Sequence, residues 1–173
     1  MYNLKRTFFL LFFILFQNNL FAETPHFIDF KYILNQSDAG KKAQNFLKSK
    51  LEKGIKSIQE KEKKIQEEEK KIIQQKKVVS ADEYKKKVTS LRNKVSSLRK
   101  ERENLLSSVA TQRQKARNEL LKNLNPIVKT YMQEKNIRMV IDKKNLLLAD
   151  ENLDITKDII KLLNNKLKSI DLK

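Results

Sequence analysis

Apolar residues recur every seven positions through the middle of the chain, a spacing typical of long paired helices. The first such column consists of Leu51, Ile58, Ile65, Ile72 and Val79. A second stretch alternates apolar spacings of three and four between Tyr84 and Ala116. Heptad spacing keeps one stripe of a helix turned toward a partner helix. The sequence therefore predicts two heptad-like helices that pack against each other.

The chain is predicted to reverse direction between these two helices, near residue 80. Ser80 is followed three residues later by Glu83, which is the spacing of a capping box at a helix N-terminus. A cap at this point ends one helix and begins the next. We therefore expect the two helices to run antiparallel.

Charged residues interrupt the apolar columns, and antiparallel pairing gives them partners. It places Glu62 beside Arg102 and Glu69 beside Lys94. Helices of roughly 40 and 50 residues, rising about 1.5 Å per residue, would form an arm on the order of 60 Å long. Because the seam between them is only half apolar, we expect the outer arm to be weakly held and able to bend. A rigid structural coiled coil would give the same pattern.

The segments on either side of the helices predict a small β body. Residues 26–30 have the pattern of a short strand. Residues 137–141 and 145–149 have the pattern of a hairpin that turns through residues 142–144. The predicted fold class is therefore α+β, with a long antiparallel helical hairpin inserted in a small β body.

The β body is also predicted to contain a final helix and to associate with other copies. The helix has its apolar face at Ile159, Ile160, Leu162, Leu163 and Leu167, with Thr156 as its expected N-cap and Asp158 in its first turn. Pro126 is expected to kink or break the second long helix where it joins the body. About sixty residues bury too small a core to be stable alone, so we expect oligomerisation through the sheet edges. The expected oligomerisation residues are apolar: Phe27, Ile28, Phe30, Met139, Val140, Ile141, Leu146 and Leu148.

The first 22 residues are predicted to be a secretory signal peptide. Lys5 and Arg6 precede an unbroken apolar run from Phe8 to Phe16, and cleavage is expected after Ala22. Nine apolar residues are about half of the ~20 needed to span a bilayer, so a permanent anchor is the weaker interpretation. The expected organisation is a signal peptide (1–22), the first part of the β body (23–40), the helical arm (41–135, with its tip near 79–82) and the second part of the β body with the C-terminal helix (136–173).

Composition excludes most kinds of catalytic site. The chain has no Cys, one His and two Gly, so we expect no thiol, zinc or haem chemistry and no glycine-rich phosphate loop. Asp29, Asp142 and Asp154 suit caps and turns better than an acid/base cluster, and the lone His26 suits a structural or exposed position. We therefore expect no catalytic residue, no metal, no cofactor and no enzymatic activity.

The chain is strongly basic, with 38 Lys and Arg residues against 21 Asp and Glu and a net charge of +17. Nearly all of the excess lies between residues 41 and 135. Such a charge would suit a protein that neutralises nucleic-acid phosphates, but an export signal argues against that function. A structural coiled coil of the cell envelope, with one defined partner, is the other alternative.

The order of elements and several short motifs resemble the Skp/OmpH family of periplasmic chaperones. The motifs are Phe27-Ile28-Asp29-Phe30, Ile33-Leu34, Ser37-Asp38-Ala39-Gly40-Lys41, Leu124-Asn125-Pro126-Ile127, Met139-Val140-Ile141-Asp142 and Leu153-Asp154-Ile155-Thr156-Lys157-Asp158-Ile159-Ile160 before Leu163-Asn164. The resemblance covers essentially the whole chain after the signal peptide. It implies a periplasmic homotrimer whose strands close a barrel-like body and whose three arms surround a cavity. It also implies an ATP-independent holdase, which binds unfolded outer-membrane proteins, its clients, and prevents their aggregation.

The resemblance places client binding on the arms, where positive charge would attract acidic unfolded chains with a strength that falls as salt rises. The candidate client-binding residues lie near the tip: Lys70, Lys71, Ile73, Lys76, Lys77, Val78, Val79, Lys85, Lys86 and Lys87. Ile72 and Tyr84 are assigned to seam packing. The expected partners are unfolded outer-membrane proteins and further copies of the chain. Anionic lipid or lipopolysaccharide is an optional contact, and no specific nucleic acid is expected.

Overall fold

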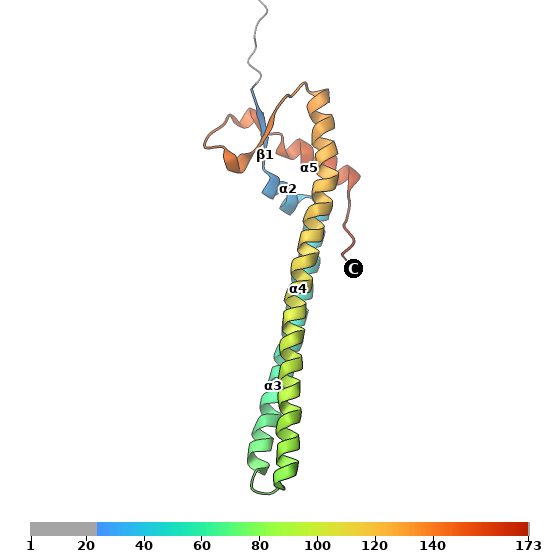
Figure 1. The fold of residues 1–173 in the computed structure, drawn as a ribbon. Coiled ribbons are helices and arrows are strands. Elements are labelled where there is room, and N and C mark those ends of the chain that lie inside the picture. Colours follow the sequence, from blue (N-terminus) through green and yellow to red (C-terminus); the bar gives the residue numbers. More distant parts are fainter. Residues whose placement is uncertain (1–23, 173) are drawn as a thin grey trace, which may run out of the picture.

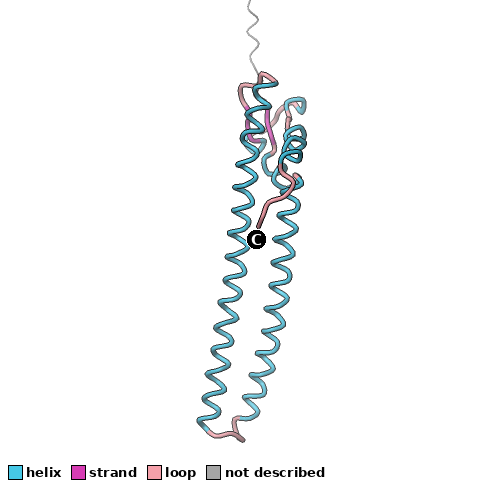
Figure 2. The backbone as a smooth tube through the Cα atoms, turned by 90° about the vertical axis from the view of Figure 1, so that its right-hand side faces the viewer, coloured by secondary structure: helices cyan, strands magenta, loops and turns pink. Residues whose placement is uncertain are grey.

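The structure is a computed structural model that describes residues 24–172, so the predicted signal peptide lies outside the described residues. The elements in chain order are β1 (His26–Ile28), α2 (Phe30–Gln36), α3 (Asp38–Gln75), α4 (Ala81–Glu134), β2 (Val140–Asp142), two short 3-10 helices (Lys143–Asn145 and Glu151–Leu153) and α5 (Thr156–Lys166). Helices α3 and α4 form a long antiparallel arm that projects from a small body (Figure 1). A view turned by 90° shows the two helices side by side down to a loop at the tip (Figure 2). The fold is α+β and mostly helical.

Both helices of the arm begin at a serine cap. The Ser37 hydroxyl accepts a hydrogen bond from the Gly40 amide at 3.2 Å, and the Ser80 hydroxyl accepts one from the Glu83 amide at 3.2 Å. Such bonds satisfy amide groups that have no partner inside the helix. The cap at Ser80 confirms the predicted reversal of the chain, and residues 76–80 form the connecting loop.

The antiparallel pairing of the arm follows the prediction to within one residue. Three apolar residues of the outer seam are buried: Ile58, Ile72 and Leu98. Glu62 pairs with Arg102 at 3.0 Å, as predicted. Lys94 pairs with Glu68 at 2.6 Å and not with Glu69. Glu68 lies at the edge of the seam, where the lysine can reach it across the helix pair, whereas Glu69 is exposed.

Helix α4 continues through Pro126 to Glu134, so the break considered for this residue does not occur. A proline inside a helix removes one backbone hydrogen bond. Leu124 and Ile127, which flank the proline, are both buried in the core of the body. The packing of these two side chains offsets the lost hydrogen bond and anchors the end of α4 in the core of the body.

The described part of the body contains one pair of parallel strands. Strands β1 and β2 pair with Phe27 opposite Ile141, so the helical hairpin is inserted between two strands that lie together. Strand β1 ends earlier than predicted, because Asp29 caps helix α2. The Asp29 carboxylate accepts a hydrogen bond from the Tyr32 amide at 2.7 Å, and Phe30 begins the helix. The sequence analysis missed this short helix.

The predicted hairpin between residues 137–141 and 145–149 is not formed. The Asp142 carboxylate accepts a hydrogen bond from the Lys144 amide at 3.2 Å and begins a 3-10 helix. Residues 146–149 are irregular, and Leu147 and Leu148 are 96% and 91% exposed. The prediction was wrong because a local side-chain cap turns the chain before a second strand can form.

The core of the body is built mainly by helices from both ends of the chain. Its buried residues are Ile33, Ala39, Leu120, Leu124, Ile127, Ile155, Ile159 and Leu163. Thr156 is the first residue of α5 and not its N-cap. Its hydroxyl instead accepts a hydrogen bond from the Asp29 amide at 2.8 Å, which ties α5 to the start of α2. These contacts anchor the base of the arm.

Candidate functional site

The described residues show no catalytic constellation. They contain no group of three His, Cys, Asp or Glu side chains that could hold a metal ion. Asp29 and Asp142 act as helix caps, and the Asp154 carboxylate accepts a hydrogen bond from the Thr156 amide at 2.9 Å. The capping interpretation of these three aspartates is confirmed. The half-buried His26 has an Nδ1 atom without a hydrogen-bond partner among residues 24–172. The candidate functional surface therefore lies elsewhere, on the arm.

The candidate client-binding residues surround the tip of the arm. Ile73 is 60% exposed and Val78 is 83% exposed, whereas Val79 is half-buried. Six lysines of this group are exposed: Lys70, Lys71, Lys76, Lys77, Lys85 and Lys86. Ile72 is buried in the seam, as predicted. The tip thus presents free apolar side chains among exposed lysines.

Lys87 differs from the other lysines at the tip because it contacts both helices. Its Nζ donates a hydrogen bond to Gln75 Oε1 at 2.7 Å and lies 3.4 Å from a carboxylate oxygen of Glu83. These contacts hold the last turn of α3 against the first turns of α4. Lys87 is therefore a bridging residue in this structure and is half-buried.

The arm has two different long faces, one on each side of the seam. On one side, called here the bridged face, polar side chains join α3 to α4. These bridges are Lys50 to Ser108 and Gln112 at 2.8 and 2.9 Å, Lys61 to Glu101 at 2.6 Å and Lys94 to Glu68 at 2.6 Å. Exposed ion pairs of this kind contribute about 0–1 kcal/mol each. The bridges therefore set the register of the helices more than they stabilise them.

The other side of the seam, called here the arginine face, carries two shallow grooves. The groove at the base of the arm has a volume of about 590 Å³ and is lined by apolar residues, by the polar Asn35, Gln44 and Asn45, and by Lys48, Arg113 and Arg117. The groove halfway along the arm has a volume of about 300 Å³ and is lined by Ile65, Val95 and Leu98 together with Glu62, Gln66, Arg99 and Arg102. The sequence analysis missed this face, although Arg92, Arg99 and Arg113 fall on one seven-residue spacing that would have indicated it.

The predicted oligomerisation residues form partly uncovered apolar surfaces on the body. Met139 is 58% exposed and Leu148 is 91% exposed, whereas Phe27 is buried. The others are half-buried: Ile28, Phe30, Val140, Ile141 and Leu146. A groove of about 570 Å³ runs beside β2 and is lined by several of them. A single chain thus leaves apolar groups of its body open to a neighbour.

Tyr131 joins the end of α4 to α5 and has a shifted pKa. Its hydroxyl donates a hydrogen bond to Asp158 Oδ2 at 2.7 Å. Burial, followed by this hydrogen bond and the charge of Asp158, raises the pKa of Tyr131 to about 12. Each cause disfavours the phenolate. Tyr131 also packs against the core of the body, and its hydroxyl stays protonated near neutral pH.

The described residues thus form a small body from which a long arm projects, and most of the basic charge of the chain lies on that arm. The family model described as "Outer membrane protein (OmpH-like)" matches residues 26–163. The chain belongs to this OmpH-like family, which confirms the resemblance seen in its motifs.

Among solved structures, the chain is similar to one described as a "putative outer membrane chaperone (OmpH-like)" from Caulobacter crescentus. The two chains share 18% sequence identity and a TM-score of 0.77, and the match covers 86% of this chain and 89% of that one. At this identity the likeness shows a shared fold. A search of curated proteins finds no match. Within residues 24–172, no helix has the length and apolar character needed to cross a membrane.

Proposed function

We propose that the chain is an ATP-independent holdase chaperone of the periplasm that binds unfolded outer-membrane proteins between the basic arms of a homotrimer. The observation that carries this proposal is the arm itself, which projects from the body with free apolar side chains and unpaired lysines at its tip. Membership of the OmpH-like family supports it. Exposed Ile73 and Val78 are available for contact with apolar client side chains.

The physical mechanism is preferential binding of the unfolded client. A protein that binds the unfolded state and not the folded state lowers the free concentration of unfolded chains by mass action. It suppresses aggregation in this way without an energy source. Positive charge along the arm attracts acidic unfolded chains from a distance, and this attraction weakens with salt because the Debye length is about 8 Å at physiological ionic strength.

Assembly into a trimer is supported by what the single chain leaves uncovered. The described body has a two-stranded sheet, and sheets of this size are marginal without further packing. Met139 and Leu148 are exposed next to it. Copies that associate through these residues would bury them and cover the strand edges. Three arms would then project in one direction around a shared space.

Two exposed groups at the tip would make the first contacts with a client. The lysines Lys70, Lys71, Lys76, Lys77, Lys85 and Lys86 form no ion pair among the described residues, so their charges are free to attract carboxylates. Ile73 and Val78 can pack against apolar client side chains. Each contact is weak, and several together would hold an extended chain reversibly.

The direct test measures aggregation of an outer-membrane barrel protein diluted from urea. The matched control replaces residues 58–104 with a short Gly-Ser linker, which keeps the buried clusters at the base of the arm. We expect near-stoichiometric full-length protein to suppress light scattering at low salt and less so at high salt, and the control to give no protection. Aggregation that proceeds unchanged at low salt with the full chain would contradict the holdase function and favour a structural coiled coil.

We also propose that residues 1–22 are removed on export, leaving Glu23 as the first residue. The intact mass of protein recovered from the periplasm would then correspond to residues 23–173. A mass that includes residues 1–22, in a protein found in the cytoplasm, would contradict the export signal. It would favour the alternative function of nucleic-acid binding.

A further inference from the structure

Arginine and lysine are distributed differently along the arm. The five arginines of the arm are Arg92, Arg99, Arg102, Arg113 and Arg117, and all of them belong to α4. Four of these arginines line the two grooves of the arginine face. Arg92 lies seven residues, or about two helical turns, before Arg99 and so projects on the same side. Lysines, by contrast, occur on both helices and on both faces.

The grooves place these guanidinium groups beside apolar surface. Leu47, Leu51, Val109 and Ala116 line the groove at the base, and Ile65, Val95 and Leu98 line the groove halfway along the arm. Val95 is 43% exposed, and Leu106, which follows Arg99 by seven residues, is 52% exposed. The arginine face is therefore a partly apolar strip with guanidinium groups along it, and one lysine, Lys48, also lines its base groove.

Most of these guanidinium groups are unengaged. Arg102 pairs with Glu62 at 3.0 Å. Arg92, Arg99, Arg113 and Arg117 form no ion pair or hydrogen bond within residues 24–172. On the bridged face, in contrast, Lys61 and Lys94 are neutralised by glutamates. The arginine face thus carries unbalanced positive charge next to open apolar grooves.

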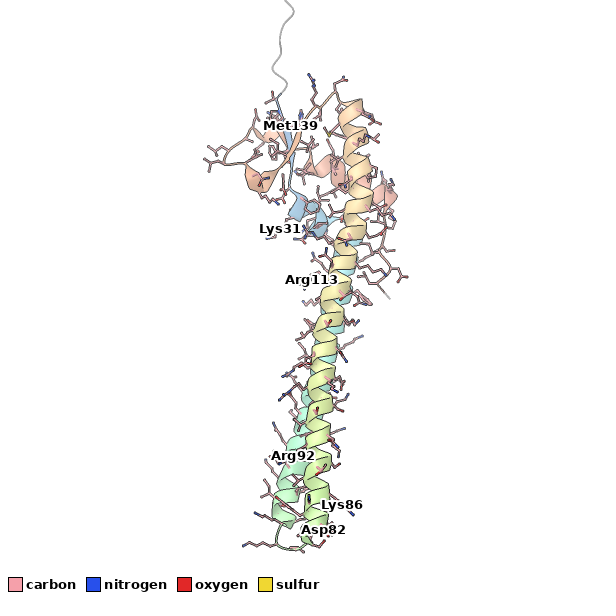
Figure 3. The ribbon with its side chains drawn as sticks, viewed as in Figure 1. Lys31, Asp82, Lys86, Arg92, Arg113 and Met139 are labelled. Atoms are coloured by element: carbon pink, nitrogen blue, oxygen red, sulfur yellow. The ribbon has the colours of Figure 1, made fainter. Side chains whose placement is uncertain are left out.

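The arginine face also looks toward the part of the body that overhangs the arm. Leu34 and Asn35 of α2 line the base groove together with Arg113. In Figure 3, Arg92 and Arg113 lie on the side of the arm where Lys31 of α2 projects, and Lys86 lies on the other side. A client held beneath the body would therefore meet the arginines.

We propose that the arginine face selects clients by binding extended segments in which an aromatic residue neighbours Asp or Glu. This inference rests on the proposed holdase function. A planar guanidinium stacks on an aromatic ring and binds a carboxylate through two parallel hydrogen bonds, and an ammonium group does neither in the same way. The aromatic ring would rest on the apolar groove while the adjacent carboxylate neutralises a free arginine. The lysines supply attraction from a distance, and the arginines supply selection.

The test variant is R92K/R99K/R113K/R117K, which keeps the charge and removes the guanidinium chemistry. The matched control, K53R/K64R/K100R/K115R, makes the reverse exchange at four exposed lysines that line neither groove. Both variants are checked for native mass and helical content. The probes are three peptides of equal length that alternate Tyr with Asp, Leu with Asp, and Tyr with Asn.

We expect the native protein to prefer the Tyr/Asp peptide over the other two. The test variant should bind the Tyr/Asp peptide about tenfold more weakly and lose the preference, because lysine can neither stack a planar group on the ring nor bind the carboxylate through two parallel hydrogen bonds. The control should bind within about twofold of the native protein, as is usual for exposed substitutions. These results would support the proposal.

Unchanged binding of the Tyr/Asp peptide by the test variant would overturn the proposal, while continued suppression of client aggregation would leave the holdase function standing. Arginine-dependent binding to phosphatidylglycerol vesicles, with peptide binding independent of arginine, would also overturn it and assign the face to lipid. If the native protein neither binds the peptides nor suppresses aggregation, the proposed function itself fails, and the selection of clients fails with it.

Discussion

The base of the arm and its outer half are built from the same two helices, but different interactions hold them. At the base, Leu120 and Leu124 of α4 are buried against Ile33, Ile159 and Leu163 from both ends of the chain. In the outer half, few apolar side chains are buried, and exposed ion pairs join the helices. Buried apolar side chains therefore hold the base of the hairpin, whereas exposed ion pairs account for much of what joins its outer half.

The magnitudes explain this difference. Full burial of one leucine or isoleucine side chain contributes about 1.5–3 kcal/mol, whereas an exposed ion pair contributes about 0–1 kcal/mol. A buried leucine or isoleucine at the base therefore stabilises the fold more than an exposed ion pair of the outer half does. Regions with few buried contacts open locally at low free-energy cost. Such local opening would suit the proposed binding of unfolded clients of many shapes.

The largest expected effect comes from a charge placed on the uncovered apolar surface of the body. Leu148→Asp should reduce the proposed trimer to smaller species, because the proposed interface would bury an unpaired carboxylate. Ile73→Asp, at an exposed site near the tip, is the matched control and should leave the mass unchanged. Sedimentation at fixed protein concentration measures both. Equal effects of the two substitutions on the mass would show that Leu148 does not lie in the interface.

A cavity at the base should have the next largest effect. Leu124→Ala removes most of a side chain that is 2% exposed, which should lower the free energy of unfolding by about 3 kcal/mol. Leu106→Ala, on the same helix but exposed, should change it by about 0.5 kcal/mol or less. Urea unfolding at one protein concentration compares the two variants. Similar losses for both would mean that base and outer arm are equally packed.

Removal of one bridge in the outer arm should have a smaller and local effect. Glu101→Gln breaks the ion pair with Lys61 and should cost about 1 kcal/mol or less. Hydrogen exchange should then speed up at outer-arm amides while base amides keep their rates. Added salt should diminish the difference from the native protein. Faster exchange throughout the body would show that the two regions unfold as one unit.

The smallest effect concerns Tyr131 at high pH. Because folding raises its pKa from about 10 to about 12, the neutral phenol favours the folded state fully below pH 10. That contribution is lost as the pH rises toward 12. Tyr131→Phe should flatten this part of the stability profile, measured by urea midpoints between pH 9 and 12. An identical profile for both proteins would show that folding does not change the pKa of the Tyr131 hydroxyl.

The arm could be predicted from the sequence because its structure depends on local periodicity. The heptad spacing predicted the two helices, and the Ser80 cap predicted where the chain reverses. Antiparallel pairing across the seam then predicted the contact of Glu62 with Arg102. Only Lys94 pairs one residue away from the expected partner. Each heptad specifies the register of the coiled coil again, so an error of one residue in one predicted pair does not shift the other pairs.

The body was harder to predict because its short elements depend on single side chains and distant contacts. Asp29 begins an unexpected helix and Asp142 ends an expected hairpin, each through one hydrogen bond to the backbone. The apolar run at residues 146–148 predicts that these side chains are buried, but the sequence does not indicate which residues cover them. The arginine face was not predicted, because the heptad pattern was defined by apolar residues and the residues that mark this face are charged.

The central claim is that copies of this chain form a trimer that holds an unfolded client among its arms. Native mass spectrometry of the exported protein, alone and with one equivalent of an unfolded barrel protein, tests both parts together. We expect a mass of three chains alone, and of three chains plus one client in the mixture. A single-chain mass in both samples, with the client found only as aggregate, would contradict the claim.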